Sequence, residues 1–294
     1  MDNNLNITYI TIDAYVELDK YRFVYFVFIF IAYILIICSN STIVCLIVIH
    51  KNLHEPMYIF IAALLMNSVL FSTALYPKIL FDVLSEKPII SYPACLFQFH
   101  IGYSLAASEF LLLAAMSYDR YVSICKPLQY PTIMRKINIC ILLVVAWILP
   151  AGQLAVTTGR SVNVKICDFN FKGIACNSTI NRLFCSREVG IYGLMCFITL
   201  LILPVLFILF TYIRIFIITY RSGREVRRKA AQTCLPHLIV LINFSCLDFP
   251  KTARLVTALQ MITYHPLFNP VIYGLKMKEI SKHLKKLLFQ VKSH

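Results

Sequence analysis

The chain has no internal repeat, no low-complexity tract and no segment that could form a separate soluble domain. It also lacks the His-Glu-x-x-His, Gly-x-Ser-x-Gly and paired-carboxylate patterns that carry metal-assisted or nucleophilic hydrolysis. We therefore expect neither an enzyme nor a bound cofactor. The missing repeats also argue against a secondary transporter, whose halves commonly repeat, so a transporter or channel is kept only as a minor alternative.

Polar residues are scarce within the long apolar runs, where Glu109 is the main ionisable side chain. Hydrophobic residues make up 59% of the 294 positions and the mean hydropathy is +0.74, whereas soluble domains contain about 45–50% apolar residues. Runs of roughly 20 apolar residues can cross the hydrocarbon layer as helices. The sequence predicts an all-α membrane protein, a seven-transmembrane helix bundle with spans at 22–49, 57–83, 94–118, 138–157, 189–219, 230–247 and 255–275.

These spans predict a single domain over residues 1–294. It consists of an outer head at 1–21, the helix bundle at 22–275 and a tail at 276–294. The first span is too long and begins too late to be a cleavable signal peptide. In the tail, apolar residues between Met277 and Leu288 recur at helical spacing opposite a lysine-rich face, which predicts a short amphipathic helix on the membrane surface.

Acidic residues are few, with 14 against 28 basic residues and a net charge of +14. If the amino terminus is extracellular, 17 of the 28 basic residues lie on the cytoplasmic side, as the positive-inside rule requires. The sequence therefore predicts a multi-pass plasma-membrane protein with a cytoplasmic carboxyl terminus. Because the basic residues lie at helix ends, the charge indicates anionic inner-leaflet lipid rather than nucleic acid as its partner.

Four of the 11 cysteines, Cys95, Cys167, Cys176 and Cys185, fall outside the membrane in this arrangement. Only these four would meet an oxidising compartment, where they could form disulfides in any of three pairings or remain free. In the outer head, Asn6 begins an Asn-x-Thr triplet and is the expected glycosylation site.

The triplet Asp119-Arg120-Tyr121 closes the third apolar run within the stretch 116–128. A charge at the end of such a helix is costly unless it faces protein, water or lipid headgroups. This stretch resembles the inner end of the third helix in odorant receptors, a branch of the rhodopsin-like G-protein-coupled receptors. A static ion pair at the headgroup boundary is the alternative interpretation.

Further motifs extend this resemblance over almost the whole chain. They are Ser39-Asn40, the loop 53–58 around Pro56, Pro204 with Tyr212, the stretch 229–238, and the Asn-Pro-x-x-Tyr motif from Asn269 to Tyr273. The stretch 229–238 is the most specific to odorant receptors. A non-olfactory receptor for a peptide or lipid is the nearest rival. The segment 90–95 looks like the fish-type members of the family.

The resemblance implies a two-state switch. A small-molecule odorant would bind between the outer halves of the spans, and a heterotrimeric G protein, usually stimulatory and cyclic-AMP-raising, would bind the inner halves. Arg120 would pair with Asp119 at rest and face Tyr212 and the G protein when active. The implied switch residues are Asp119, Arg120, Tyr121, Tyr212, Asn269, Pro270 and Tyr273.

The resemblance also implies a role for Glu109, which lies 11 residues before Arg120. In the family this position pairs with an aspartate of the second span to hold sodium. Here Asn67 and Ser68 stand in the matching stretch and no aspartate is present. Glu109 is therefore expected either to be protonated or to contact sodium together with these neutral ligands.

Two disulfides are implied as well, because the family ties the start of the third span to the second outer loop. We expect Cys95–Cys176, with Cys167–Cys185 as a second bridge.

The expected ligand wall is apolar, although plain helix packing explains each of its members equally well. Gly102 and Tyr103 stand where amine receptors carry an aspartate, which argues against a biogenic amine. The sixth apolar run ends at Leu247, so the outer turns of that span are expected to be short. The predicted wall residues are Phe99, Tyr103, Ala106, Ala107, Cys196, Phe197, Leu200, Leu259, Ile262 and Thr263.

Overall fold

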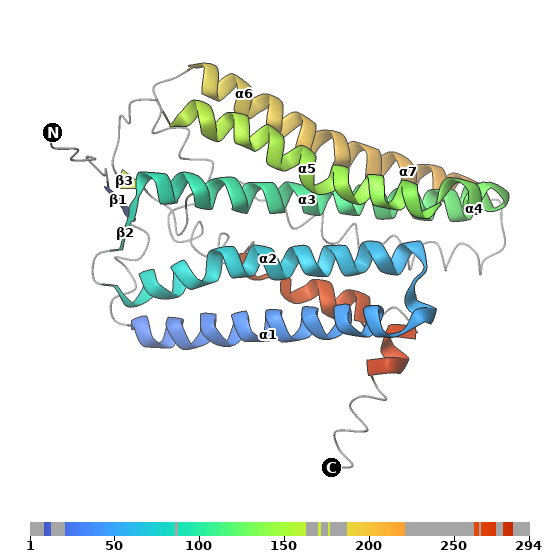
Figure 1. Ribbon diagram of the computed structural model, residues 1–294, viewed down its shortest axis with the longest axis horizontal. Helices are drawn as coiled ribbons and strands as arrows, with labels where there is room; N and C mark the ends of the chain where they lie inside the picture. The colour runs from blue at the N-terminus through green and yellow to red at the C-terminus, as the bar shows by residue number, and fades with distance from the viewer. Residues whose placement is uncertain are drawn as a thin grey trace, which may run out of the picture.

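The computed structural model describes residues 9–12, 21–85, 88–162, 170–171, 176, 187–220, 262–264, 266–274 and 279–284. Within these ranges, five helical segments are long and apolar enough to cross a membrane, and they run side by side as a bundle (Figure 1). The predicted sixth span at 230–247 lies outside the described residues. The predicted seventh is described in part, as helix at 262–264 and 266–274.

The long helices follow the apolar runs closely. They are α1 (Arg22–Ile49), α2 (Pro56–Leu84), α3 (Tyr92–Cys125), α5 (Lys136–Ser161), and a fifth span made of α6 (Arg187–Phe197), the π-helical turn η5 (Ile198–Ile202) and α7 (Leu203–Tyr220). Between them lie η2 (Lys51–Leu53), η3 (Pro127–Gln129) and the short α4 (Tyr130–Ile133). The third span was predicted to end near 118, but α3 continues to Cys125 and places Asp119 and Arg120 inside the helix.

Prolines mark several features of these helices. Pro56 and Pro93 occupy the first positions of α2 and α3, where the missing N–H costs no helical hydrogen bond. Pro204 lies in α7 directly after the π-helical turn η5. A proline ring clashes with the backbone carbonyl four residues earlier, which here is that of Leu200. The π-helical turn is wider than an α-helical turn and relieves this clash. It lies where Pro204 predicts an irregularity in the helix.

The helix α3 forms the centre of the bundle. On one side of it lie α5 and the α6–α7 span, and on the other lie α2 and then α1 (Figure 1). In the most apolar stretch of α3, 61% of residues are buried, against 22% in α1, in α5 and in the fifth span. The outer helices instead expose large apolar side chains, such as Phe23 at 78% and Phe28 at 72%. Such a surface is compatible with lipid hydrocarbon, which confirms an α-helical membrane protein.

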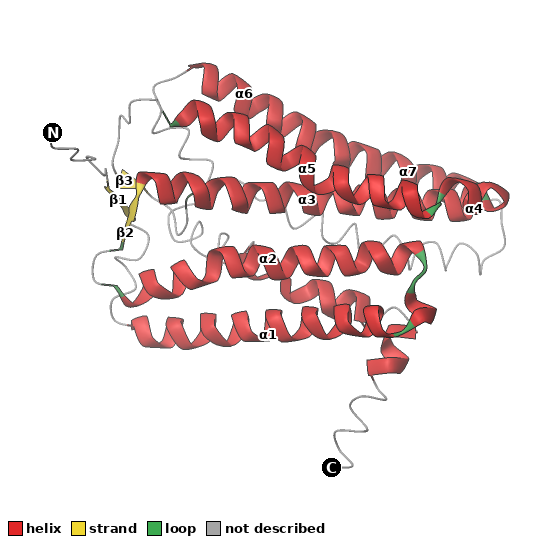
Figure 2. Ribbon diagram, viewed as in Figure 1, coloured by secondary structure: helices red, strands yellow, loops and turns green. Residues whose placement is uncertain are grey.

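A small sheet, which was not predicted, lies at one end of the bundle (Figure 2). Strand β1 (Tyr9–Ile12) pairs antiparallel with β2 (Ile89–Ser91), with Tyr9 opposite Ser91, and parallel with β3 (Asn170–Phe171). We refer to this end of the bundle as the sheet end and to the opposite end as the α4 end. The sheet joins the predicted outer head to the start of α3.

The Cys95–Cys176 disulfide lies beside this sheet, with the two Cα atoms 5.5 Å apart. Both cysteines are buried, and the bridge ties the first turns of α3 to the segment that follows β3. The proposed second pair, Cys167 and Cys185, and the glycosylation site Asn6 lie outside the described residues.

In the part of the chain that the structure describes, the buried side chains form two clusters along the bundle. The sheet-end cluster includes Tyr76, Phe99 and Ile262, with Tyr103 packed against it. The α4-end cluster includes Tyr212 and Tyr273. Some of the predicted ligand-wall residues belong to the sheet-end cluster, and two of the predicted switch residues belong to the α4-end cluster.

Candidate functional site

At the α4 end, Asp119 and Arg120 form an ion pair within α3. Arg120 donates from Nε and from a terminal nitrogen to Asp119 Oδ2, at 3.0 and 2.5 Å. The Asp119 side chain is fully buried, whereas that of Arg120 exposes 20% of its surface. A buried carboxylate requires partners, and this pair satisfies one of its two oxygens.

The second Asp119 oxygen is held by a residue that sequence reasoning missed. Tyr130, the first residue of α4, donates its hydroxyl hydrogen to Asp119 Oδ1 at 2.8 Å. Burial, and then the neighbouring Asp119 carboxylate, raise the pKa of the Tyr130 phenol above its usual value. Tyr130 therefore stays protonated and acts as a donor, which connects the loop after α3 to the ion pair.

Three further predicted switch residues lie in or against the same cluster. Tyr212 on α7 and Tyr273 are buried, with 7% and 4% exposure, and Tyr121 packs against the α4-end cluster. The pairing of Arg120 with Asp119, which the resemblance implies for the resting state, is present in this structure; the switch itself stays a prediction. Pro270 is buried next to Asn269 in the helical segment 266–274.

Midway along the bundle, Asn269 joins three helices. Its Nδ2 donates to Ser68 Oγ on α2 and to Glu109 Oε1 on α3, both at 3.1 Å. Its Oδ1 is buried and makes no hydrogen bond among the described residues. Without water in the surrounding hydrocarbon, such interhelical bonds stabilise helix association.

This geometry bears on the expected sodium contact of Glu109. The carboxylate, the Ser68 hydroxyl and the Asn269 amide are hard oxygen donors of the kind that alkali cations take. In the arrangement observed, however, the Asn269 nitrogen lies between the two oxygens. A cation at Glu109 would require this amide to turn. The other expected ligand, Asn67, is engaged elsewhere: it donates to Leu105 O at 2.9 Å and accepts from Trp147 Nε1 at 3.2 Å.

The helical residues 262–264 and 266–274 are also bonded to α1 and α2. Asn40 Nδ2 donates to Pro266 O at 2.8 Å, and Tyr76 donates its hydroxyl hydrogen to Thr263 Oγ1 at 3.0 Å. Next to α1, a Cβ atom added at Gly274 would lie 3.1 Å from Ile43 Cδ1, so glycine permits the close approach of the two helices. Thr263, a predicted wall residue, therefore has a polar partner on another helix, which is Tyr76 of α2.

The predicted ligand wall divides into two groups. Phe99 and Tyr103, whose ring centroids are 4.7 Å apart, lie in or against the sheet-end cluster with Ile262. Thr263 adjoins them through Tyr76, which the sequence analysis did not identify. Ala106 and Ala107 continue the same helix and are half-buried.

The second group lies on the fifth span. Cys196 and Leu200 are buried, and Cys196 Sγ lies 3.8 Å from Thr157 Oγ1 of α5. Phe197 differs, because it exposes 44% of its surface. Successive side chains of a helix point about 100° apart, so Phe197 does not lie on the buried side that Cys196 occupies. Phe197 is therefore not grouped with the other predicted wall residues of the fifth span. Leu259 lies outside the described residues.

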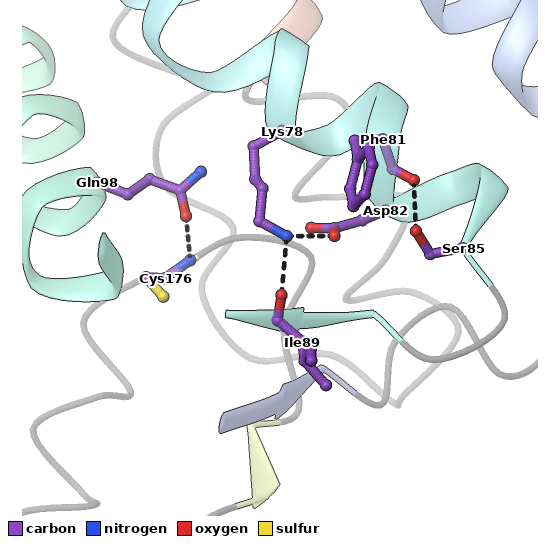
Figure 3. A network of polar contacts seen from close by, with 7 residues as sticks. All are labelled: Lys78, Phe81, Asp82, Ser85, Ile89, Gln98 and Cys176. Atoms are coloured by element: carbon purple, nitrogen blue, oxygen red, sulfur yellow. Dashed lines mark hydrogen bonds and ion pairs between the residues drawn. The ribbon is translucent and has the colours of Figure 1, made fainter. Parts of the chain in front are cut away.

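A polar network closes the sheet end (Figure 3). Lys78 on α2 forms an ion pair with Asp82, four residues later, and donates to Ile89 O of β2 at 3.1 Å. Nearby, Gln98 Oε1 on α3 accepts a hydrogen bond from Cys176 N at 3.2 Å. Lys78 and Gln98 thus fasten the sheet and the disulfide segment to two different helices. The spacing of Lys78 and Asp82 is the helical salt-bridge spacing that could have indicated this pair in the sequence.

The Tyr76–Thr263 bond gives a direct test of helix placement. We expect Tyr76→Phe to lower the free energy of unfolding by about 1 kcal/mol, because one partly buried hydrogen bond is lost. Thr263→Val should do the same, and the double variant should cost less than the sum of the two. Thermal unfolding in detergent measures all three. Tyr33→Phe, which keeps its ring stacked on Tyr76 at 5.3 Å, is the control. Strict additivity would show that the two side chains do not interact.

Comparison with known proteins gives one family. Residues 28–291 match the sequence profile described as "Olfactory receptor". Human olfactory receptor 11A1 is 32% identical over 97% of this chain and 95% of its own length. Human olfactory receptor 10J4 is 33% identical over 91% of each chain, and human olfactory receptor 2K2 is 28% identical over 92% of this chain and 90% of its own.

Proposed function

Because the chain belongs to the olfactory receptor family, we propose that it binds a small-molecule odorant near the sheet end and activates a heterotrimeric G protein at the α4 end. The family assignment and the helical bundle make it a membrane receptor rather than an enzyme. The observation that carries the G-protein assignment is the Asp119–Arg120 pair, which closes one end of the bundle and is exposed only through Arg120. The partner is expected to be stimulatory and to raise cyclic AMP.

The proposed orientation places the sheet end outside the cell and the α4 end in the cytosol. The segments at 9–12 and 279–284 lie at opposite ends of the bundle, which supports an odd number of crossings (Figure 1). An outer disulfide at Cys95 also fits an oxidising compartment. The plasma membrane is the proposed location.

The proposed ligand site is the face formed by Phe99, Tyr103, Ile262 and Thr263. Aromatic and aliphatic side chains with a few polar groups, here the hydroxyl groups of Tyr103 and Thr263, are typical of a pocket for a small, mostly apolar molecule. The absence of a charged side chain among these four supports an uncharged odorant. The fish-type assignment stays a prediction.

A cyclic-AMP screen of odorants on cells that express the chain tests the proposal. We expect a concentration-dependent rise for at least one compound, and we expect Phe99→Ala to weaken it. Purified protein that carries an ion current in the absence of a G protein would instead support the channel alternative and contradict the proposal.

Tyr130→Phe should raise the basal cyclic-AMP signal. The variant removes the hydrogen bond to Asp119 Oδ1 and leaves the ring in place, so the resting ion pair loses one of its supports. A hydrogen bond to a charged group contributes about 1.5 kcal/mol, which corresponds to at most about a tenfold shift between the two states. Tyr118→Phe is the matched control, since Tyr118 contacts the Phe207 ring through its own ring. An unchanged basal signal in Tyr130→Phe at equal surface density would remove Tyr130 from the switch.

A further inference from the structure

A groove with a volume of about 690 Å³ lies on the surface of the bundle near the α4 end. It runs between α1, α2 and α5 and is separate from the residues assigned to ligand or G protein. Its floor is apolar and includes Ile47, Ile59, Ala62, Ile139 and Leu143.

The groove is bordered by exposed apolar surface. Among the residues that line it, Val48 exposes 66% of its surface and Cys140 is also exposed. Side chains of this kind on a membrane-spanning bundle contact lipid. The apolar floor therefore suits a lipid acyl chain.

The end of the groove nearest the membrane surface is positively charged. Lys136, the first residue of α5, lines the groove and is exposed, and Arg135 precedes it and is also exposed. None of the described residues that line the groove is acidic. In the adjoining loop, the exposed Glu55 precedes Pro56 of the groove, and the exposed Lys51 of the same loop carries the opposite charge.

A further feature favours an anion at this point. Among the described residues no side chain caps the start of α5, so the first-turn N–H groups of this helix lie at the positive end of its dipole without a side-chain acceptor.

We propose that this groove binds an anionic phospholipid from the surrounding bilayer. Its phosphate lies between Lys136, Arg135 and the start of α5, and one acyl chain runs along Ile59, Ile139 and Leu143. The charge pattern selects against a sterol, whose uncharged hydroxyl would leave both cations without a counter-charge. With the orientation proposed above, this lipid belongs to the inner leaflet; the preference for an anionic headgroup does not depend on that orientation.

The test uses the purified full chain in nanodiscs that contain equal amounts of phosphatidylglycerol and phosphatidylcholine. Lipids that remain bound after transfer to detergent are counted by native mass spectrometry. We expect phosphatidylglycerol to be retained preferentially, and Lys136→Ala to reduce that preference about fivefold, because a basic side chain near anionic lipid contributes about 1 kcal/mol. Lys126→Ala, a loss of an exposed lysine that does not line the groove, should leave it unchanged.

A second variant tests the apolar floor. Ala62→Trp should fill the groove and lower the retention of both lipids, and Leu143→Phe serves the same purpose if Ala62→Trp does not fold. Equal effects of Lys136→Ala and Lys126→Ala, or displacement of the lipid by cholesterol at equal concentration, would overturn the proposal. The readout requires no signalling, so its failure is distinct from failure of odorant-dependent cyclic-AMP production.

Discussion

Arg120→Ala should abolish G-protein activation while receptor still reaches the cell surface. The Arg120 guanidinium is the cation that neutralises the fully buried Asp119, and Arg120 is the partly exposed member of the pair at the α4 end. Removing it takes away both the ion pair seen in the structure and the group proposed to face the G protein. Tyr130 still donates to Asp119, which gives the fold one remaining support for this carboxylate.

The measurement is the odorant-dependent cyclic-AMP response, normalised to surface density. Arg160→Ala is a matched control, because Arg160 is an arginine at the sheet end whose ion pair with Glu188 is 3.9 Å long and largely exposed. Such an exposed pair contributes little to stability. A normal response from Arg120→Ala would contradict the switch assigned to this residue.

Loss of the Cys95–Cys176 disulfide should have the second large effect. The bridge joins residues separated by 81 positions, and removing such a bridge costs about 2–5 kcal/mol. It also releases the segment that Gln98 holds through Cys176 N. We expect Cys95→Ser, Cys176→Ser and the double variant to lose most of their surface delivery.

Surface staining against total expression measures this loss. Cys38→Ser is the control, since Cys38 is a free and exposed cysteine of α1. If the double variant reached the surface as well as Cys38→Ser does, the disulfide would not be needed for folding.

The apolar runs predicted the long helices because length and hydropathy suffice to define a span. The run at 22–49 gave the bounds of α1, and those of α2 and α5 differ by only a few residues. The end of α3 was missed for a physical reason. Hydropathy falls at Asp119 and Arg120, but their charges are paired within the protein, so the helix continues to Cys125.

The sequence could not reveal contacts that depend on how each helix is rotated. Glu109 was recognised as needing a partner, yet the partner proved to be the Asn269 amide, which donates from the seventh predicted span. Tyr76 and Tyr130 carried no motif signal, although both hold predicted site residues. The sheet was missed because its strands are four, three and two residues long and come from segments far apart in the chain.

Epitope tags at the two chain ends, read by antibody in intact and in permeabilised cells, test the central claim most directly. The receptor architecture predicts that the amino-terminal tag is stained on intact cells and that the carboxyl-terminal tag is stained only after permeabilisation. Detection of both tags on the same side of the membrane would contradict a seven-span bundle with Arg120 in the cytosol.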